Sequence, residues 1–168
     1  IRPLALLAAA ANIVWIFFWH YNLYPLTLVA MLVLLGALLA IYLNLKVGTI
    51  KVGRREFWLA HVTHSIYLGW ITVATIANVT QVLFYINWDG FGLAPQLWAV
   101  IMLAATVVIG GLMAFTRRDI AYLLVLAWAI VGIALKFPAE PLLAPAAWVA
   151  AGFQGVWVLV SVYLRMRK

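Results

Sequence analysis

Hydrophobic positions in this chain form long unbroken runs, separated by short stretches where polar and turn-forming residues gather. A bilayer core of about 30 Å needs about 20 apolar residues per helical span, and the runs have this length. They do not alternate as a membrane strand would; the run from Leu28 to Leu43 is continuous. The pattern therefore predicts an all-α, polytopic membrane bundle of six transmembrane helices. The predicted helices are 3–20, 25–45, 57–86, 95–115, 119–136 and 142–164.

Composition supports a membrane protein and disfavours a soluble one. Hydrophobic residues make up 68% of the chain and charged residues 9%, whereas a soluble domain is about 45–50% apolar and about 25% charged. The lipid bilayer is therefore the first expected partner. The net charge of +7 would suit a nucleic-acid partner, but the basic residues lie between hydrophobic runs and not on one solvated domain. We expect no nucleic acid.

The basic residues predict the orientation of the chain. Ten of the eleven Lys and Arg residues fall at the termini and in the connections after the second and fourth runs. The connections after the first and third runs carry none, and the connection after the fifth carries only Lys136. Since cytoplasmic loops are enriched in Lys and Arg, both ends of the chain are expected to be cytoplasmic. The expected location is the inner (plasma) membrane of a bacterium.

Polar and aromatic side chains follow one face of the third predicted helix at three- and four-residue steps. The members of this stripe are Tyr67, Trp70, Ala74, Asn78, Gln81 and Tyr85. The amides of Asn78 and Gln81 need partners in a dry environment, so they either bond a neighbouring helix or line a ligand cavity. Both interpretations stand at this point. Four tryptophans lie deep in the spans, where the indole N–H also seeks a partner: Trp15, Trp70, Trp128 and Trp157.

Catalytic chemistry is not expected. The four acidic residues lie at or beyond helix ends, cysteine is absent, and no nucleophile pairs with a base inside a span. This lack of charge within the spans also disfavours ion-coupled transport. His20, His61 and His64 are weak candidates for metal ligands, because His61 and His64 stand one helical turn apart. Interfacial hydrogen bonding is the commoner role of such histidines.

Two runs carry a resemblance to a known family. The first is Ala11-Asn12-Ile13-Val14-Trp15, and the second is the stretch from Ser65 to Asn78, in which Trp70 precedes Asn78 by eight positions. In these runs the chain resembles the tryptophan-rich sensory protein, or translocator protein (TspO/MBR), family. The resemblance implies that residues 1–86 contain the family's third to fifth helices and that residues 87–168 form a three-helix membrane extension. The family's first two helices would precede Ile1, and its proline before the aromatic residue is replaced around Thr63 and His64.

The resemblance also implies a function. The family binds hydrophobic ring-fused molecules, tetrapyrroles and sterols among them, in a cavity between helices. By position, Trp70, Ala74 and Asn78 would face this cavity, Asn12 and Trp15 would face the same interior, and Tyr67 belongs to the same stripe. The leading hypothesis is a non-catalytic protein that binds a porphyrin, another pigment or a sterol-like molecule.

Two other functions remain open. The first is an accessory or structural subunit of a larger membrane complex, which could itself bind a pigment. The second is a small-solute transporter, and only the number of helices supports it. Ala147, Ala151 and Gly155 recur at four-residue spacing and allow another backbone to approach closely. We favour packing within the chain over a homodimer face for these residues.

Overall fold

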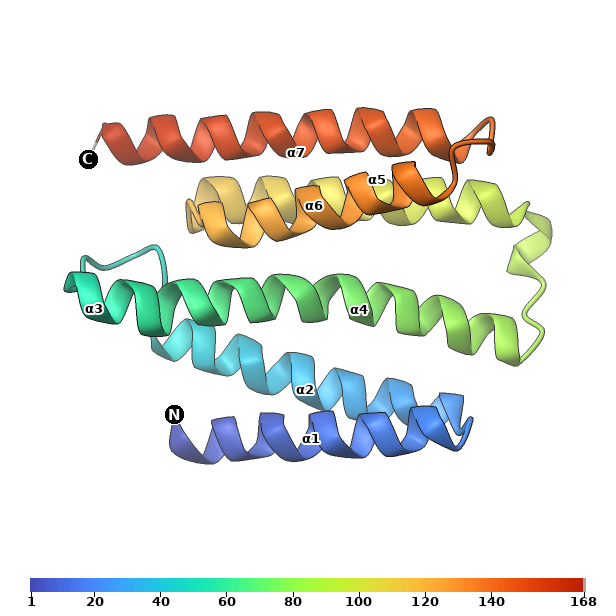
Figure 1. Cartoon of the computed structure of the whole chain (residues 1–168), viewed down its shortest axis with the longest axis horizontal. Helices are drawn as coiled ribbons and strands as arrows, with labels where there is room; N and C mark the ends of the chain where they lie inside the picture. Colours follow the sequence, from blue (N-terminus) through green and yellow to red (C-terminus); the bar gives the residue numbers. More distant parts are fainter. Residues whose placement is uncertain (168) are drawn as a thin grey trace. The chain divides into compact units, whose positions relative to one another are not determined.

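The computed structural model describes residues 1–167, and these fold into six helical rods joined by short connections (Figure 1). No strand occurs among them. The helices are α1 (Arg2–His20), α2 (Tyr24–Asn44), α3 (Arg54–Glu56) continuing into α4 (Thr63–Tyr85), α5 (Pro95–Thr116), α6 (Ile120–Lys136) and α7 (Leu143–Met166). The predicted all-α bundle of six helices is confirmed.

Helix boundaries agree with the predicted ones to within a few residues, with two differences. The third rod begins at Arg54 and not at residue 57, because the charged Arg54–Glu56 turn is already helical. Pro25 and Pro95 lie in the first turns of α2 and α5, where the missing N–H of proline costs nothing. The last helix is expected from residue 142, and α7 begins at Leu143, two residues after Pro141.

Five of the rods are long and apolar enough to cross a membrane. The sixth, α6, has 17 apolar-rich residues and a length of about 25 Å at 1.5 Å per residue, the short end of the range for a span. Large apolar side chains point outward along the rods, as on α1, where Leu6 and Phe17 are exposed. These features are those of an integral membrane protein.

The chain divides into two compact units, Ile1–Trp88 and Asp89–Lys168. In the first unit, α2 packs against both α1 and α4 (Figure 1). Its buried side chains form the core of this unit: Met31, Leu34, Leu38, Ile41 and Tyr42. Aromatic rings connect the three helices where α1 ends, α2 begins and α4 ends. The ring centroids of Trp19 and Tyr24 are 5.4 Å apart, and those of Tyr24 and Tyr85 are 5.2 Å apart.

Between α3 and α4 the backbone forms a π-helical segment, Phe57–Val62. A π turn contains one more residue than an α turn, and such segments are frequent at functional sites. Side chains of the following turn bond the carbonyls that this wider turn offers: the Thr63 hydroxyl donates to Trp58 O at 3.2 Å and the Ser65 hydroxyl to His61 O at 2.8 Å. Two backbone carbonyls of the segment are therefore bonded by side chains of the next turn.

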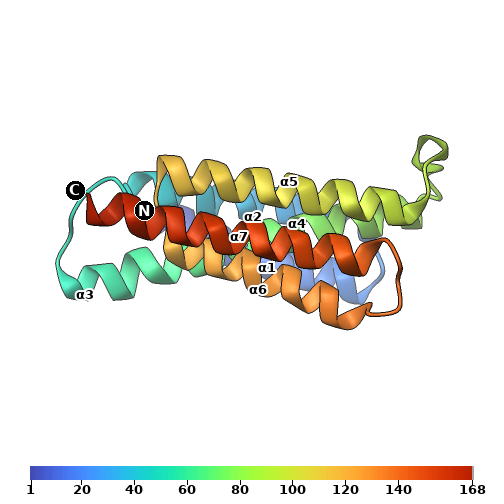
Figure 2. The same ribbon diagram turned by 90° about the horizontal axis from the view of Figure 1, so that it is seen from above.

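In the second unit, α7 packs against both α5 and α6, and Figure 2 shows it running between them. A close contact lies at Gly110 and Gly111 of α5, against which Gln154 and Trp157 of α7 pack. Gln154 Nε2 donates to the Thr106 carbonyl at 2.9 Å, and Trp157 Nε1 donates to the Val107 carbonyl at 3.1 Å. Two neighbouring α5 carbonyls therefore bind α7 polar groups.

The small residues of α7 pack mostly within this unit. Ala147 is fully buried in a core that it shares with Leu103 of α5 and Ile130 of α6, and Ala151 packs against the same core. At the end of α7, Arg165 Nε donates to the Arg118 carbonyl at 2.7 Å. The basic α5–α6 turn and the basic end of α7 therefore lie at one end of the unit, as the charge pattern predicts.

Candidate functional site

A partly open groove of about 330 Å³ lies within the first unit, with walls from α1 and α4 and a floor from α2. We call it the α1–α4 groove. Its lining consists of Ala5, Ala8, Ala9, Asn12, Ile13, Leu38, Ile41, His64 and Tyr67. The volume is at the small end of the roughly 300–1,000 Å³ that is typical of ligand pockets.

Spacing along each helix explains why the groove exists. Ala5, Ala8 and Ala9 repeat at three- and four-residue steps, which places them on one face of α1, and their methyl groups leave space where larger side chains would fill it. Leu38 and Ile41 stand one turn apart on α2 and provide an apolar floor. The alanine-rich face is the sequence signal for this groove, and our sequence analysis did not use it.

Three polar side chains line this otherwise apolar groove: Asn12 from α1 and His64 and Tyr67 from α4. Asn12 and Tyr67 are predicted ligand residues, and His64 is a weak metal candidate. Within residues 1–167 we find no hydrogen-bond partner for the Asn12 amide or the Tyr67 hydroxyl. Apolar walls with a few convergent polar groups are the usual composition of a small-molecule site.

The imidazole of His64 is held in one orientation. Its Nδ1 lies 2.8 Å from the carbonyl oxygen of Ala60. Because a carbonyl only accepts hydrogen bonds, Nδ1 carries a proton. In the neutral ring, Nε2 then has a lone pair and can accept a hydrogen bond or bind a metal.

Asn78 has a different environment from Asn12. Its side chain is 2% exposed, and its Nδ2 donates to the Thr27 hydroxyl of α2 at 2.9 Å, while that hydroxyl lies 2.6 Å from the Tyr24 carbonyl and donates to it. Of the two interpretations open for this amide, the observed contact is the interhelical one. Ligand contact by Asn78 stays a prediction.

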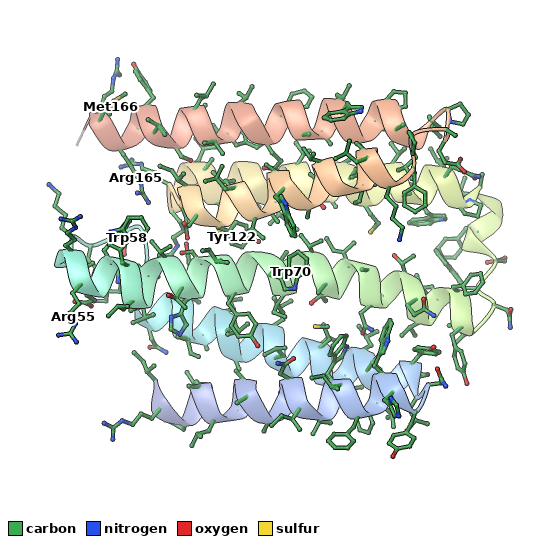
Figure 3. The ribbon with its side chains drawn as sticks, in the orientation of Figure 1. Arg55, Trp58, Trp70, Tyr122, Arg165 and Met166 are labelled. Atoms are coloured by element: carbon green, nitrogen blue, oxygen red, sulfur yellow. The ribbon has the colours of Figure 1, made fainter. Side chains whose placement is uncertain are left out.

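The other predicted site residues lie outside the groove lining. Trp70 is 46% exposed and lies about half way along the Arg54–Tyr85 rod, while Trp58 and Arg55 lie near the start of the same rod (Figure 3). Ala74 is half-buried. Trp15 Nε1 is buried without a hydrogen-bond partner in the described part of the chain, and the ring lies 5.6 Å from that of Trp19.

The histidines do not come together as a multi-ligand metal centre. His20 is exposed at the end of α1. His61 is 3% exposed, and its Nε2 is buried without a partner among residues 1–167. No group of three His, Cys, Asp or Glu side chains suited to a metal ion occurs in that range. Only His64 lines the α1–α4 groove.

A second hollow, of about 620 Å³, lies at the α6–α7 connection of the second unit. Its lining includes three prolines, Trp148 and one carboxylate, that of Glu140. The sequence analysis did not predict it. Because it offers a single ionisable group and no predicted ligand residue, the α1–α4 groove is the stronger candidate site.

Comparison with known proteins gives one match. The model of a family described as TSPO-like protein matches residues 1–160. This match extends beyond residues 3–86, on which the resemblance in the sequence rests, and includes α5 and α6 and most of α7. No curated protein and no solved structure gives a significant match.

Proposed function

The chain belongs to the TSPO-like protein family, and from this premise we propose that it binds a hydrophobic ligand in the α1–α4 groove without catalysing a reaction. The observation that carries the proposal is the set of three polar side chains, Asn12, His64 and Tyr67, in an apolar groove. Polar groups without partners are costly inside a membrane protein. A ligand that bonds to them removes this cost.

The ligand class we propose is a tetrapyrrole or a sterol-like molecule. Both are large apolar ring systems with a few polar substituents, and the groove offers the matching surface: alanine and aliphatic walls for the rings, and an amide, a phenol and an imidazole for the substituents. The protein would then sequester or present this ligand at the membrane. The family's role in binding such molecules supports this choice.

On the proposed topology the groove lies in the cytoplasmic half of the bilayer. Its α1 residues follow the basic N-terminus, and its α4 residues follow the basic connection that contains Lys51, Arg54 and Arg55. We propose that both ends of the chain are cytoplasmic and that the membrane is a bacterial inner membrane. A ligand would then enter from the cytoplasmic leaflet or from lipid.

A matched pair of α1 variants tests ligand binding. Ala9 and its neighbour Ala10 are both exposed, but Ala9 lines the groove and Ala10 does not. Ala9→Phe should fill the groove and lower the affinity for protoporphyrin IX or a fluorescent sterol, measured by titration in detergent. The expected loss is at least about tenfold in affinity, which corresponds to about 1.4 kcal/mol. Ala10→Phe should leave the affinity unchanged. Equal affinities for all three proteins would refute binding in this groove.

An accessory subunit of a larger membrane complex remains the second candidate. Gly152 and Gly155 of α7 have no atom within 4 Å of the position that a Cβ would occupy, so part of this helix has room for the close approach of another helix. Native electrophoresis of mild detergent extracts tests this candidate. A species of the mass of a single chain, with no larger assembly, would exclude it.

A further inference from the structure

The hollow of about 620 Å³ at the α6–α7 connection, which we call the α6–α7 hollow, combines one carboxylate with an otherwise apolar lining. All of its lining residues belong to the second unit, and it shares none of them with the α1–α4 groove. Apart from Glu140, the lining consists of alanine and leucine side chains, three prolines and Trp148. The volume lies within the roughly 300–1,000 Å³ that is typical of ligand pockets.

The backbone of Glu140 is hydrogen-bonded on both sides, but its carboxylate has no partner. Glu140 N donates to the Phe137 carbonyl at 3.2 Å, and the Glu140 carbonyl accepts from Ala144 N at 3.1 Å. Within residues 1–167 the carboxylate forms neither a hydrogen bond nor an ion pair, and α7 begins without a side-chain cap. Lys136, four positions earlier, instead has its Nζ 5.4 Å from the centroid of the Phe137 ring. The carboxylate therefore has neither of the two ordinary structural roles, an ion pair or a helix cap, in the described part of the chain.

The chemistry of the lining favours a cation over an anion. A carboxylate only accepts hydrogen bonds, and proline has no backbone N–H, so the three prolines offer carbonyl acceptors and no amide donors. The lining contains no Lys, Arg or His. Trp148 is 51% exposed, and the face of an indole ring attracts an ammonium group. A carboxylate and an accessible indole in one apolar hollow are the groups that bind an organic ammonium ion.

We propose that the α6–α7 hollow binds an organic ammonium ion with an apolar body, a quaternary ammonium or a protonated alkylamine. The Glu140 carboxylate pairs with the positive charge, the Trp148 ring contacts the ammonium substituents, and the prolines and alanines contact the apolar body. The occupant is a free cation and not a phospholipid, because the phosphate of a phospholipid headgroup would need a Lys or Arg side chain that the lining lacks. This site goes beyond the proposed function and does not depend on it.

Benzyltrimethylammonium is the probe, titrated by calorimetry into the whole chain in nonionic detergent. It should bind saturably, whereas benzyl alcohol, which has the ring without the charge, should not. Glu140→Gln keeps the size of the side chain and removes its charge, so it should lower the affinity for the probe by at least about tenfold. Trp148→Leu keeps an apolar side chain and removes the ring, so it should lower the affinity by about two- to fivefold.

Matched controls come from the first unit. Glu56→Gln and Trp58→Leu make the same two changes outside the hollow and should bind the probe as the unsubstituted protein does. Absence of saturable binding, or an affinity that Glu140→Gln leaves unchanged, would overturn the proposal. If Glu140→Gln does not fold, an unchanged affinity of Trp148→Leu would overturn it. Ala9→Phe should leave ammonium binding intact, so this site and the α1–α4 groove can fail separately.

Nanodiscs distinguish a free cation from a lipid headgroup. The affinity for benzyltrimethylammonium should be the same in nanodiscs of phosphatidylcholine, whose headgroup is a quaternary ammonium, and in nanodiscs of a neutral galactolipid. A loss of probe binding that is confined to phosphatidylcholine and absent in the galactolipid would assign the hollow to a lipid headgroup and overturn the proposal of a free cation.

Discussion

Replacing Gly110 by alanine should destabilise the second unit, although alanine is the better helix former. Gly110 is buried in the interior of α5, and an added Cβ would meet Gln154 Oε1 and lie 2.7 Å from its Nε2. Gln154 is fully buried, so its side chain has little space to move aside. Its hydrogen bond to the Thr106 carbonyl, at 2.9 Å, would be distorted or lost.

The magnitude follows from three opposing contributions. Alanine gains about 1 kcal/mol over glycine in a helix interior. Overpacking of a tight core costs about 1–3 kcal/mol, and an interhelical hydrogen bond in a membrane protein contributes about 0.6–1.7 kcal/mol. The steric and polar costs exceed the gain in propensity, so Gly110→Ala should lower the free energy of unfolding by about 1–3 kcal/mol.

Thermal unfolding in mild detergent, monitored by tryptophan fluorescence, measures this effect. Gly132→Ala on α6 is the control, because no atom lies within 4 Å of its added Cβ; it should be neutral or stabilising by up to about 1 kcal/mol. In the double variant Gly110→Ala/Gln154→Ala the extra methyl gains space. Gln154→Ala should therefore lower the free energy of unfolding less in the Gly110→Ala background than in the unsubstituted protein. The reasoning is refuted if Gly110→Ala unfolds at or above the midpoint of Gly132→Ala.

Two further predictions concern the first unit and the topology. Thr27→Val removes the hydroxyl to which Asn78 donates at 2.9 Å and leaves a buried amide unpaired, so it should lower the free energy of unfolding in detergent by about 1–3 kcal/mol. A double-mutant cycle with Asn78→Ala should show a coupling energy of about 0.6–1.7 kcal/mol, and additive effects would contradict the prediction. Because the chain has no cysteine, a single introduced cysteine shows on which side of the membrane its residue lies. Lys51→Cys should react with a membrane-impermeant maleimide only after the cytoplasmic side is opened. Ala139→Cys should react in intact cells. The reverse pattern would invert the topology.

The fold could be predicted from the sequence because hydropathy and length are enough to locate helices in lipid. The errors fall where these two signals weaken. The Arg54–Glu56 turn is charged and therefore carries no hydrophobic signal, yet it continues the α4 rod. The π-helical segment Phe57–Val62 was also missed, because a single extra residue in one turn does not change the apolar pattern detectably.

The candidate site was predicted only in part, and the reason is pairing across long sequence distances. Asn78 and Thr27 are 51 positions apart, and the stripe on α4 has the same periodicity whether its amide bonds a helix or a ligand. The groove depends on the absence of bulk at Ala5, Ala8 and Ala9. Alanine in a membrane helix is so common that its spacing indicates a cavity only once the neighbouring helices are placed.

The buried interhelical amides and the polar side chains of the α1–α4 groove have different environments, and this difference supports the proposed site. Asn78 and Gln154 are deeply buried and donate to the next helix; they hold each unit together. The Asn12 amide, the Tyr67 hydroxyl and His64 Nε2 line one groove, whose floor is Leu38 and Ile41 of α2, and have no protein partner within residues 1–167. Elsewhere, Trp15 Nε1, His61 Nε2 and Gln154 Oε1 are also buried without a partner in the described part of the chain, but the α1–α4 groove brings three polar side chains together in one apolar lining. The proposed polar-edged hydrophobic ligand would pair with these three side chains.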